Sequence, residues 1–195
     1  IKVKLEKASD RLWLAGADLT VSKVQITDAA GTVHAGKYVA ADPRAGVARV
    51  DFGSTLQPQQ LTLTIDYTAP LNAQLQGLYK VSAKGKPYAM TQMEPISARF
   101  AFPGFDEPGF KTPFDISITA PVDETVVANT KPVSEQSAGK GWKTVTFART
   151  VPLPTYLVAF AVGPWDVVAG PDIAPDAYRA KPLQMRGVAA EGEGH

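Results

Sequence analysis

Two polar side chains that lie two residues apart, Gln92 and Glu94, offer the clearest chemistry in this sequence. They fall in an extended stretch, residues 88–111, that concentrates aromatics, prolines and polar groups. Side chains at positions i and i+2 of a strand leave the same face, about 7 Å apart. An amide supplies a carbonyl acceptor, and a carboxylate accepts charge-assisted hydrogen bonds. Together they could hold one protonated primary amine, such as a peptide N-terminus; the alternative is an exposed strand pair without function.

Asp106 and Glu107 are adjacent carboxylates, a combination that could serve acid-base chemistry. Neighbouring residues of an extended chain point apart, however, and an Asp before Glu107-Pro108 is typical of a turn. We therefore assign both carboxylates to structure. Arg99 lies upstream of them, and we predict that it pairs with one of the two and holds the loop in place.

The remaining candidate groups are interpreted as structural. His34 stands alone in a polar segment and is expected to be an ordinary surface residue. Glycines separate the carboxylates and the imidazole of residues 191–195, which we interpret as a flexible terminal tail. Trp13, Trp142 and Trp165 each stand alone in the sequence, as expected for core or sheet-surface aromatics rather than a sugar-binding platform.

The elements that must position these residues are predicted to be strands. Apolar and polar residues alternate in short segments broken by Gly, Pro, Asp and Asn, a pattern typical of antiparallel strands with one buried face. Sixteen prolines argue against long helices. The clearest predicted strands are residues 1–7, 19–27, 47–52, 61–67, 114–119, 125–129, 142–149 and 156–162, with one more at 183–188.

Two glycine-containing segments are predicted to be turns between these strands, residues 42–46 and 137–141. The predicted fold class is therefore all-β, with little helix and a large, mostly antiparallel curved sheet or β-sandwich. No internal repeat is visible, which disfavours a propeller or a solenoid.

Composition excludes several classes of function. Twenty basic and nineteen acidic residues, scattered along the chain, give a net charge of +1 and no basic patch for nucleic acid. The absence of cysteine excludes disulfides, thiolate zinc sites and cysteine nucleophiles, but it assigns no compartment. No run approaches the roughly 18–20 apolar residues that a membrane span needs. A periplasmic or secreted location and a cytoplasmic one both stay open.

The run over residues 91–111 resembles a signature of the aminopeptidase N family of zinc peptidases. The matching motifs are Thr91-Gln92-Met93-Glu94-Pro95, Ala98-Arg99, Phe102-Pro103 and Asp106-Glu107-Pro108. Residues 152–163 are similar to the family's strand near the end of the same domain. This resemblance implies the N-terminal β domain of such an enzyme over residues 1–180, with the family's first strands preceding Ile1. Residues 181–195 would be a connector or strand leading into the catalytic domain.

The resemblance also implies roles for individual residues. Glu94 would bind the α-ammonium of the substrate, and Gln92 would line the pocket for its first side chain, while Met93 faces the other way and is packed. The family's peptide bond after this glutamate is cis, and Pro95 makes that isomer inexpensive, so we predict a cis Glu94–Pro95 bond. Gly104 occupies a position that is often Cys in relatives. The glycine lacks that small buried side chain, but no functional group is expected to be lost.

The catalytic parts implied by the resemblance are missing from this chain. The family holds one zinc with an H-E-x-x-H helix and a distant glutamate, and binds substrate with a Gly-Ala-Met-Glu-Asn loop, whereas the only histidines here are His34 and His195. The parent would be a zinc aminopeptidase that removes N-terminal residues from peptides. The isolated chain should bind no catalytic zinc and cleave nothing. Its partners would be the peptide N-terminus and its own catalytic domain. The alternatives are a free-standing β binding or adhesion module and a catalytically decayed scaffold relative.

Overall fold

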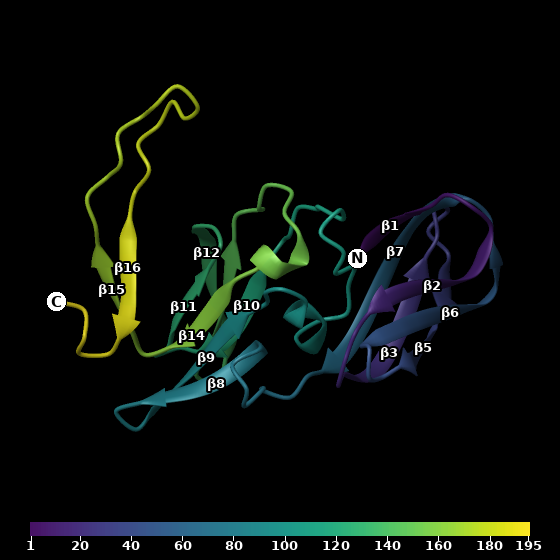
Figure 1. Ribbon diagram of the computed structural model, residues 1–195, viewed down its shortest axis with the longest axis horizontal. Coiled ribbons are helices and arrows are strands. Elements are labelled where there is room, and N and C mark those ends of the chain that lie inside the picture. Colours follow the sequence, from purple (N-terminus) through teal and green to yellow (C-terminus); the bar gives the residue numbers. More distant parts are fainter. The chain divides into compact units, whose positions relative to one another are not determined.

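The computed structural model describes all 195 residues and divides them into two compact units (Figure 1). Unit 1 consists of Ile1–Lys80, Thr91–Phe114 and Thr150–Ala159. Unit 2 consists of Val81–Met90, Asp115–Arg149 and Phe160–His195. All the strand pairs are antiparallel, and the helices are two short 3-10 turns, η1 (Ser97–Phe100) and η2 (Thr155–Leu157). The predicted all-β, mostly antiparallel fold class is thus confirmed.

Unit 1 is built around two sheets. One has the order β1-β7-β3-β4, with β1 (Lys2–Leu5), β7 (Gln59–Thr68), β3 (Thr20–Thr27) and β4 (Val33–Ala35). The other has the order β2-β6-β5, with β2 (Ser9–Ala15), β6 (Val47–Leu56) and β5 (Lys37–Asp42). Their alternating apolar residues meet in one core, to which the first sheet contributes Leu5, Val24, Ile26, Leu61 and Leu63 and the second Leu14, Ala48, Val50, Phe52 and Leu56. These two sheets therefore form a β-sandwich.

The chain crosses from one sheet of the sandwich to the other at Gly36, between β4 and β5. A β-carbon at this position would lie 2.5 Å from Ile26 Cδ1 and 2.7 Å from Val24 Cγ1. Gly36 also donates its N–H to the Val24 carbonyl, 3.0 Å away. The crossing thus brings backbone directly against the core, which leaves no space for a larger residue.

Unit 2 holds shorter sheets. One has the order β10-β13-β12, with β10 (Ser117–Pro121), β13 (Trp142–Phe147) and β12 (Pro132–Gly139). Another has the order β11-β14-β9-β8, with β11 (Thr125–Ala128), β14 (Phe160–Gly163), β9 (Lys86–Gln92) and β8 (Gly77–Ala83). The chain passes between the two units within β8 and within β9. The last strands, β15 (Trp165–Ala169) and β16 (Arg186–Ala190), pair only with each other.

Most of the predicted strands are present, with shifted ends. The prediction of a strand over residues 156–162 is wrong in its first half, because Thr155–Leu157 form η2 and β14 begins at Phe160. The backbone closes on itself there instead, because the Leu157 N–H donates to the Pro154 carbonyl at 3.1 Å and the Val158 N–H to the Thr155 carbonyl at 3.0 Å. The turn predicted at residues 42–46 is confirmed as the β5–β6 connection. The one predicted at residues 137–141 is shorter than expected, because β12 runs to Gly139 and only residues 140–141 form the turn to β13. None of the helical segments is long and apolar enough to cross a membrane.

The interpretation of residues 191–195 as a flexible tail is wrong. Glu191 and Glu193 form ion pairs with Lys86 and Lys84, on the β8–β9 hairpin. The hydrogen bonds to these carboxylates raise the pKa of both lysines. Asp166 also contacts this segment. Its Oδ2 accepts the N–H of Gly192 at 2.7 Å and that of Gly194 at 3.1 Å. The domain boundary at residue 180 remains a prediction.

Candidate functional site

Gln92 is the last residue of β9, and Glu94 lies in the short segment between β9 and η1. Both side chains are exposed, whereas Met93 between them is 1 % exposed. The alternation of the strand thus continues past its last ladder residue, so the amide and the carboxylate share the open side while the thioether is packed. The prediction that Met93 is packed is confirmed. Glu94 takes part in no ion pair of the structure.

The segment after Glu94 turns sharply. The peptide bond from Glu94 to Pro95 is cis, as predicted. Ser97 then donates its N–H to the Met93 carbonyl at 2.7 Å, which closes the turn. Pro95 and Ile96 are exposed, and the 3-10 helix η1 that follows buries Ser97 and Ala98. Glu94 therefore lies between two buried residues, Met93 before it and Ser97 after it.

Arg99 pairs with Asp106, which confirms the predicted pairing. Arg99 Nε lies 2.9 Å from Asp106 Oδ2, and the two side chains are 17 % and 4 % exposed. The second carboxylate oxygen, Oδ1, accepts the Thr155 hydroxyl at 3.2 Å, in a buried contact. A buried carboxylate satisfied by a guanidinium and a hydroxyl is a structural link, and here it joins η1, the loop after it and η2.

Arg99 also ties this segment to the sandwich of unit 1. Its Nη1 donates to the Ala45 carbonyl, in the turn between β5 and β6, and its own carbonyl accepts the Ala17 N–H at 2.8 Å. Gly46 has φ +65°, and a β-carbon there would lie 2.6 Å from Arg99 Cδ. The turn thus needs glycine both for its backbone angle and for the close approach of this side chain.

Asp106, Glu107 and Pro108 serve the turn that the sequence predicts. Asp106 is buried while Glu107 is exposed, so the two carboxylates point apart. The Phe110 N–H donates to the Glu107 carbonyl at 2.9 Å across the turn. Gly104, just before, exchanges two backbone hydrogen bonds with Ala15, of 2.7 and 2.9 Å, and a β-carbon there would find its nearest neighbour at 3.6 Å. A small side chain would therefore fit at Gly104.

The comparison with family models matches residues 1–157 to the peptidase M1 N-terminal domain. That range covers most of the chain and includes every residue of the site described above. The chain belongs to this family. The resemblance that the sequence suggests is thereby confirmed at the level of the M1 N-terminal domain.

Several curated proteins are similar to this M1 N-terminal domain. Puromycin-sensitive aminopeptidase of Caenorhabditis elegans is 31 % identical over 175 residues, which is 87 % of this chain and 18 % of the relative. Aminopeptidase M1-A of Oryza sativa subsp. japonica is 34 % identical over 77 % of this chain and 17 % of its own length. Glutamyl aminopeptidase of Homo sapiens is 38 % identical over 54 % of this chain and 12 % of its own. The chain thus spans less than a fifth of these relatives.

The two histidines of this M1 N-terminal domain do not form a metal site. No group of three or more His, Cys, Asp or Glu side chains that could hold a metal ion is present among the 195 residues. His34 is partly exposed, in keeping with the surface position that we predicted, and its Nε2 lies 3.0 Å from Asp28 Oδ2. Oδ1 of the same aspartate accepts the N–H groups of Ala30 and Thr32, and these bonds, led by the one from His34, lower the pKa of Asp28. The residues present therefore do not fit a catalytic zinc.

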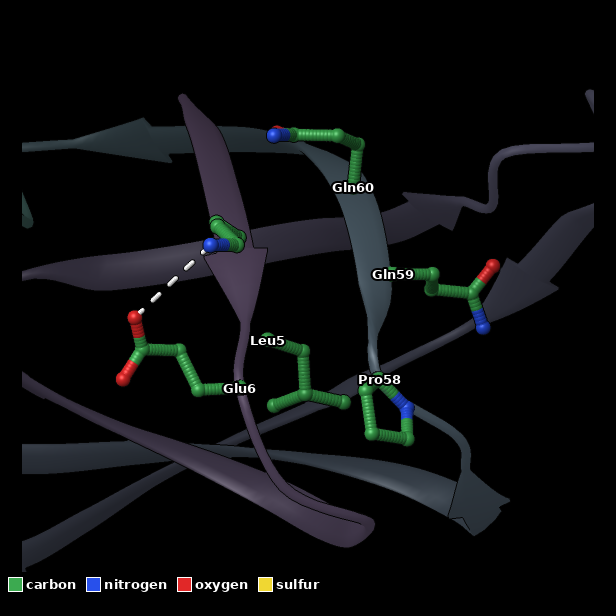
Figure 2. Close-up of a pocket in the computed structure, with 6 residues that line it drawn as sticks. Leu5, Glu6, Pro58, Gln59 and Gln60 are labelled. Atoms are coloured by element: carbon green, nitrogen blue, oxygen red, sulfur yellow. Dashed lines mark ion pairs between the residues drawn. The ribbon is translucent and has the colours of Figure 1, made fainter.

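A shallow hollow of unit 1 lies away from the residues described above (Figure 2). It is lined by Lys4, Leu5 and Glu6 of the β1 segment and by Pro58, Gln59 and Gln60 at the start of β7. Figure 2 shows the labelled Glu6 side chain with a dashed line to its ion-pair partner; Lys4 Nζ lies 3.9 Å from Glu6 Oε1. The lining of this hollow includes neither Gln92 nor Glu94.

Sequence reasoning missed two partners in the site. Thr155, which bonds Asp106, is 49 residues away from it along the chain, and Ala45, which accepts from Arg99, contributes only its carbonyl oxygen. Neither partner could be recognised from neighbouring residues in the sequence.

The Asp28 contact with His34 does have a local signal. An Asp that precedes a short turn commonly bonds the N–H groups two to four residues further on, which fixes its own orientation.

Proposed function

We propose that this chain is the substrate-anchoring part of a zinc-dependent aminopeptidase, in which Glu94 binds the α-ammonium of a peptide and Gln92 supports that contact. The single observation that carries the proposal is the exposure of Gln92 and Glu94 on either side of the buried Met93. An exposed carboxylate beside an amide oxygen offers the acceptors that a primary ammonium needs.

The names of the relatives support the reaction class. They are aminopeptidases, which act on the first residue of a chain, and family membership favours this class over a free-standing adhesion module. An exopeptidase must fix the register of its substrate. A carboxylate that holds the free amine does so, because only the first peptide bond then reaches the reacting centre, and the orientation is set by binding. Gln92 would in addition line the pocket for the first side chain.

The zinc and the groups that activate water would come from a part of the full-length protein outside these residues. This chain would contribute binding and orientation alone, so by itself it should hold no catalytic zinc and hydrolyse no peptide. The network of Arg99, Asp106 and Thr155 supports the role of Glu94, since it fixes the backbone on the C-terminal side of that residue through η1. A binding group on a rigid segment loses less conformational entropy when the substrate arrives.

The decisive experiment is a kinetic comparison in the full-length enzyme. A hydrogen bond to a charged group is worth about 1.5–3 kcal/mol. Glu94→Gln should therefore lower kcat/KM for a free-amine peptide roughly 10- to 100-fold, at about 1.4 kcal/mol per tenfold change. The zinc content of the enzyme should stay unchanged. Glu107→Gln, which alters an exposed carboxylate in the turn nearby, is the matched control and should leave kcat/KM as it is.

Unchanged kinetics of Glu94→Gln would defeat the assignment of the ammonium site. A full-length protein that bound no zinc and cleaved no peptide would instead identify a relative that serves only as a scaffold. The two outcomes are separable because the first is measured on an active enzyme and the second is read from metal analysis.

A further inference from the structure

Exposed apolar side chains gather on residues 165–190 of unit 2, which we call the arm. The arm consists of β15, β16 and the segment that joins them, which Figure 1 shows as a narrow loop running on beyond the ends of both strands. Seven of its large hydrophobic residues are exposed: Val167, Val168, Ile173, Tyr178, Leu183, Met185 and Val188. Exposed apolar side chains concentrated in one short segment are a feature of contact sites.

The backbone of the arm is satisfied by its own hydrogen bonds. Ile173 and Leu183 exchange two bonds of 2.9 Å, and Gly170 donates to the Met185 carbonyl at 2.9 Å. At the tip, Asp176 Oδ1 accepts the N–H groups of Tyr178 and Arg179 at 2.8 and 2.9 Å. The backbone of the arm is therefore shaped by bonds within the arm itself.

The two faces of the β15–β16 pair differ. Val168 and Asp166 share one face, and the chain's last residues lie against it, since a β-carbon on Gly194 would come within 2.9 Å of Val168 Cγ2. Val167 and Val188 stand directly opposite each other on the other face and are 48 % and 39 % exposed. A two-stranded ribbon is marginal in water on its own, so this uncovered valine face is where a partner would stabilise it.

We propose that the arm is an intramolecular docking strap, whose Val167/Val188 face and tip pack into an apolar groove on the polypeptide that follows His195 in the full-length protein. The proposal rests on the proposed function, because it takes the remaining length of the aminopeptidase as the partner. The matched relatives leave 82 % or more of their own length outside the aligned region. His195 lies only five positions beyond the last residue of β16.

The short connection favours this partner over a second copy of the chain. A tether of a few residues gives an effective concentration in the millimolar range, whereas a second copy must associate at its own concentration. The connection is also pinned, because Asp166 holds Gly192 and Gly194. Polypeptide that continues from His195 therefore starts beside the arm. Tyr178, whose side chain is fully exposed at the tip, would be the aromatic anchor of the contact.

Hydrogen–deuterium exchange of the full-length protein tests this proposal. The variant is the double substitution Val167→Asp/Val188→Asp, and the matched control is Val133→Asp, an exposed valine of β12 outside the arm. The double substitution should speed exchange of the arm amides about tenfold or more, because it opens a local contact, while the control leaves their exchange unchanged. If the double variant unfolds as a whole, the single substitution Leu183→Asp at the exposed distal pair gives the same readout.

Two results would overturn the proposal. One is equal exchange of the arm amides in the wild type and in the Asp variants. The other is protection that rises with protein concentration, which would assign the valine face to a second copy. The exchange measurement needs no substrate, so it is independent of the kinetics of Glu94→Gln. If Glu94→Gln lowers activity but the arm amides are not protected, the docking proposal is refuted while the amine site is retained.

Discussion

Replacing Asp106 by alanine should unfold unit 1 far more readily than its single lost side chain suggests. Asp106 is 4 % exposed and links Arg99 to Thr155. Its removal leaves the Arg99 guanidinium, itself only 17 % exposed, without its nearest countercharge, and leaves the Thr155 hydroxyl without its acceptor. The large effect thus comes from the partners that stay behind, since a buried charge that loses its partner keeps the full cost of its desolvation.

The magnitude follows from this burial. Breaking a buried ion pair by removing one partner costs about 3–5 kcal/mol. The part of Arg99 that reaches water lets it rehydrate, so we expect the lower end, about 3 kcal/mol. For a chain of this size each 1 kcal/mol corresponds to about 2–4 °C in Tm, so the expected fall is about 6–12 °C. Asp106→Asn, which keeps the shape and one acceptor, should fall between the wild type and Asp106→Ala.

The assay must report on unit 1 by itself. Hydrogen exchange of the β3 and β7 amides does so, because both strands carry core residues of the sandwich. A loss of about 3 kcal/mol corresponds to roughly a hundredfold faster exchange of amides that open only by unfolding of the unit. The matched control is Asp10→Ala. Asp10 also forms two hydrogen bonds with an arginine, Arg11, at 2.8 and 2.9 Å, but the two side chains are 52 % and 41 % exposed.

The comparison separates burial from hydrogen-bond geometry. Asp10→Ala removes a pair joined by two hydrogen bonds from the solvent-exposed surface. It should change amide exchange little, since exposed ion pairs are screened by water. The reasoning is refuted if the β3 and β7 amides of Asp106→Ala exchange no faster than those of Asp10→Ala.

Two further perturbations have expected outcomes. Gly36→Ala should lower the free energy of unfolding by about 1–3 kcal/mol, because its methyl group would overlap Ile26 and Val24, and an unchanged thermal unfolding curve would contradict this. Asp28, whose pKa is lowered from its ordinary value of 3.8, should stabilise the fold fully above that pH and progressively less as the pH falls through its folded-state pKa. His34→Ala removes the first cause of that lowering, so urea titrations between about pH 2 and 6 should show a shallower acid loss of stability than in the wild type; identical slopes would sink the assignment.

Local pattern predicted much of the site. Met93 between two polar residues predicts its own burial, and the seven-residue spacing of Arg99 and Asp106 lets one loop bring them together. Partners distant in sequence were not predictable in this way. The ion pairs of Lys84 with Glu193 and of Lys86 with Glu191 join segments more than a hundred residues apart. Their only trace in the sequence is the matched spacing, Lys-Gly-Lys against Glu-Gly-Glu.

The sequence by itself determined the all-β class, the family and the residues that face outward at Gln92 and Glu94, because period-two alternation and a contiguous motif are properties of neighbouring residues. Only the tertiary structure decided that residues 1–80 close into a two-sheet sandwich around Ile26 and Val50, and that the apolar residues of the arm stay uncovered. The physical reason is the same in both cases. Burial depends on which distant surface comes to lie against a side chain, and that surface is chosen by the fold as a whole.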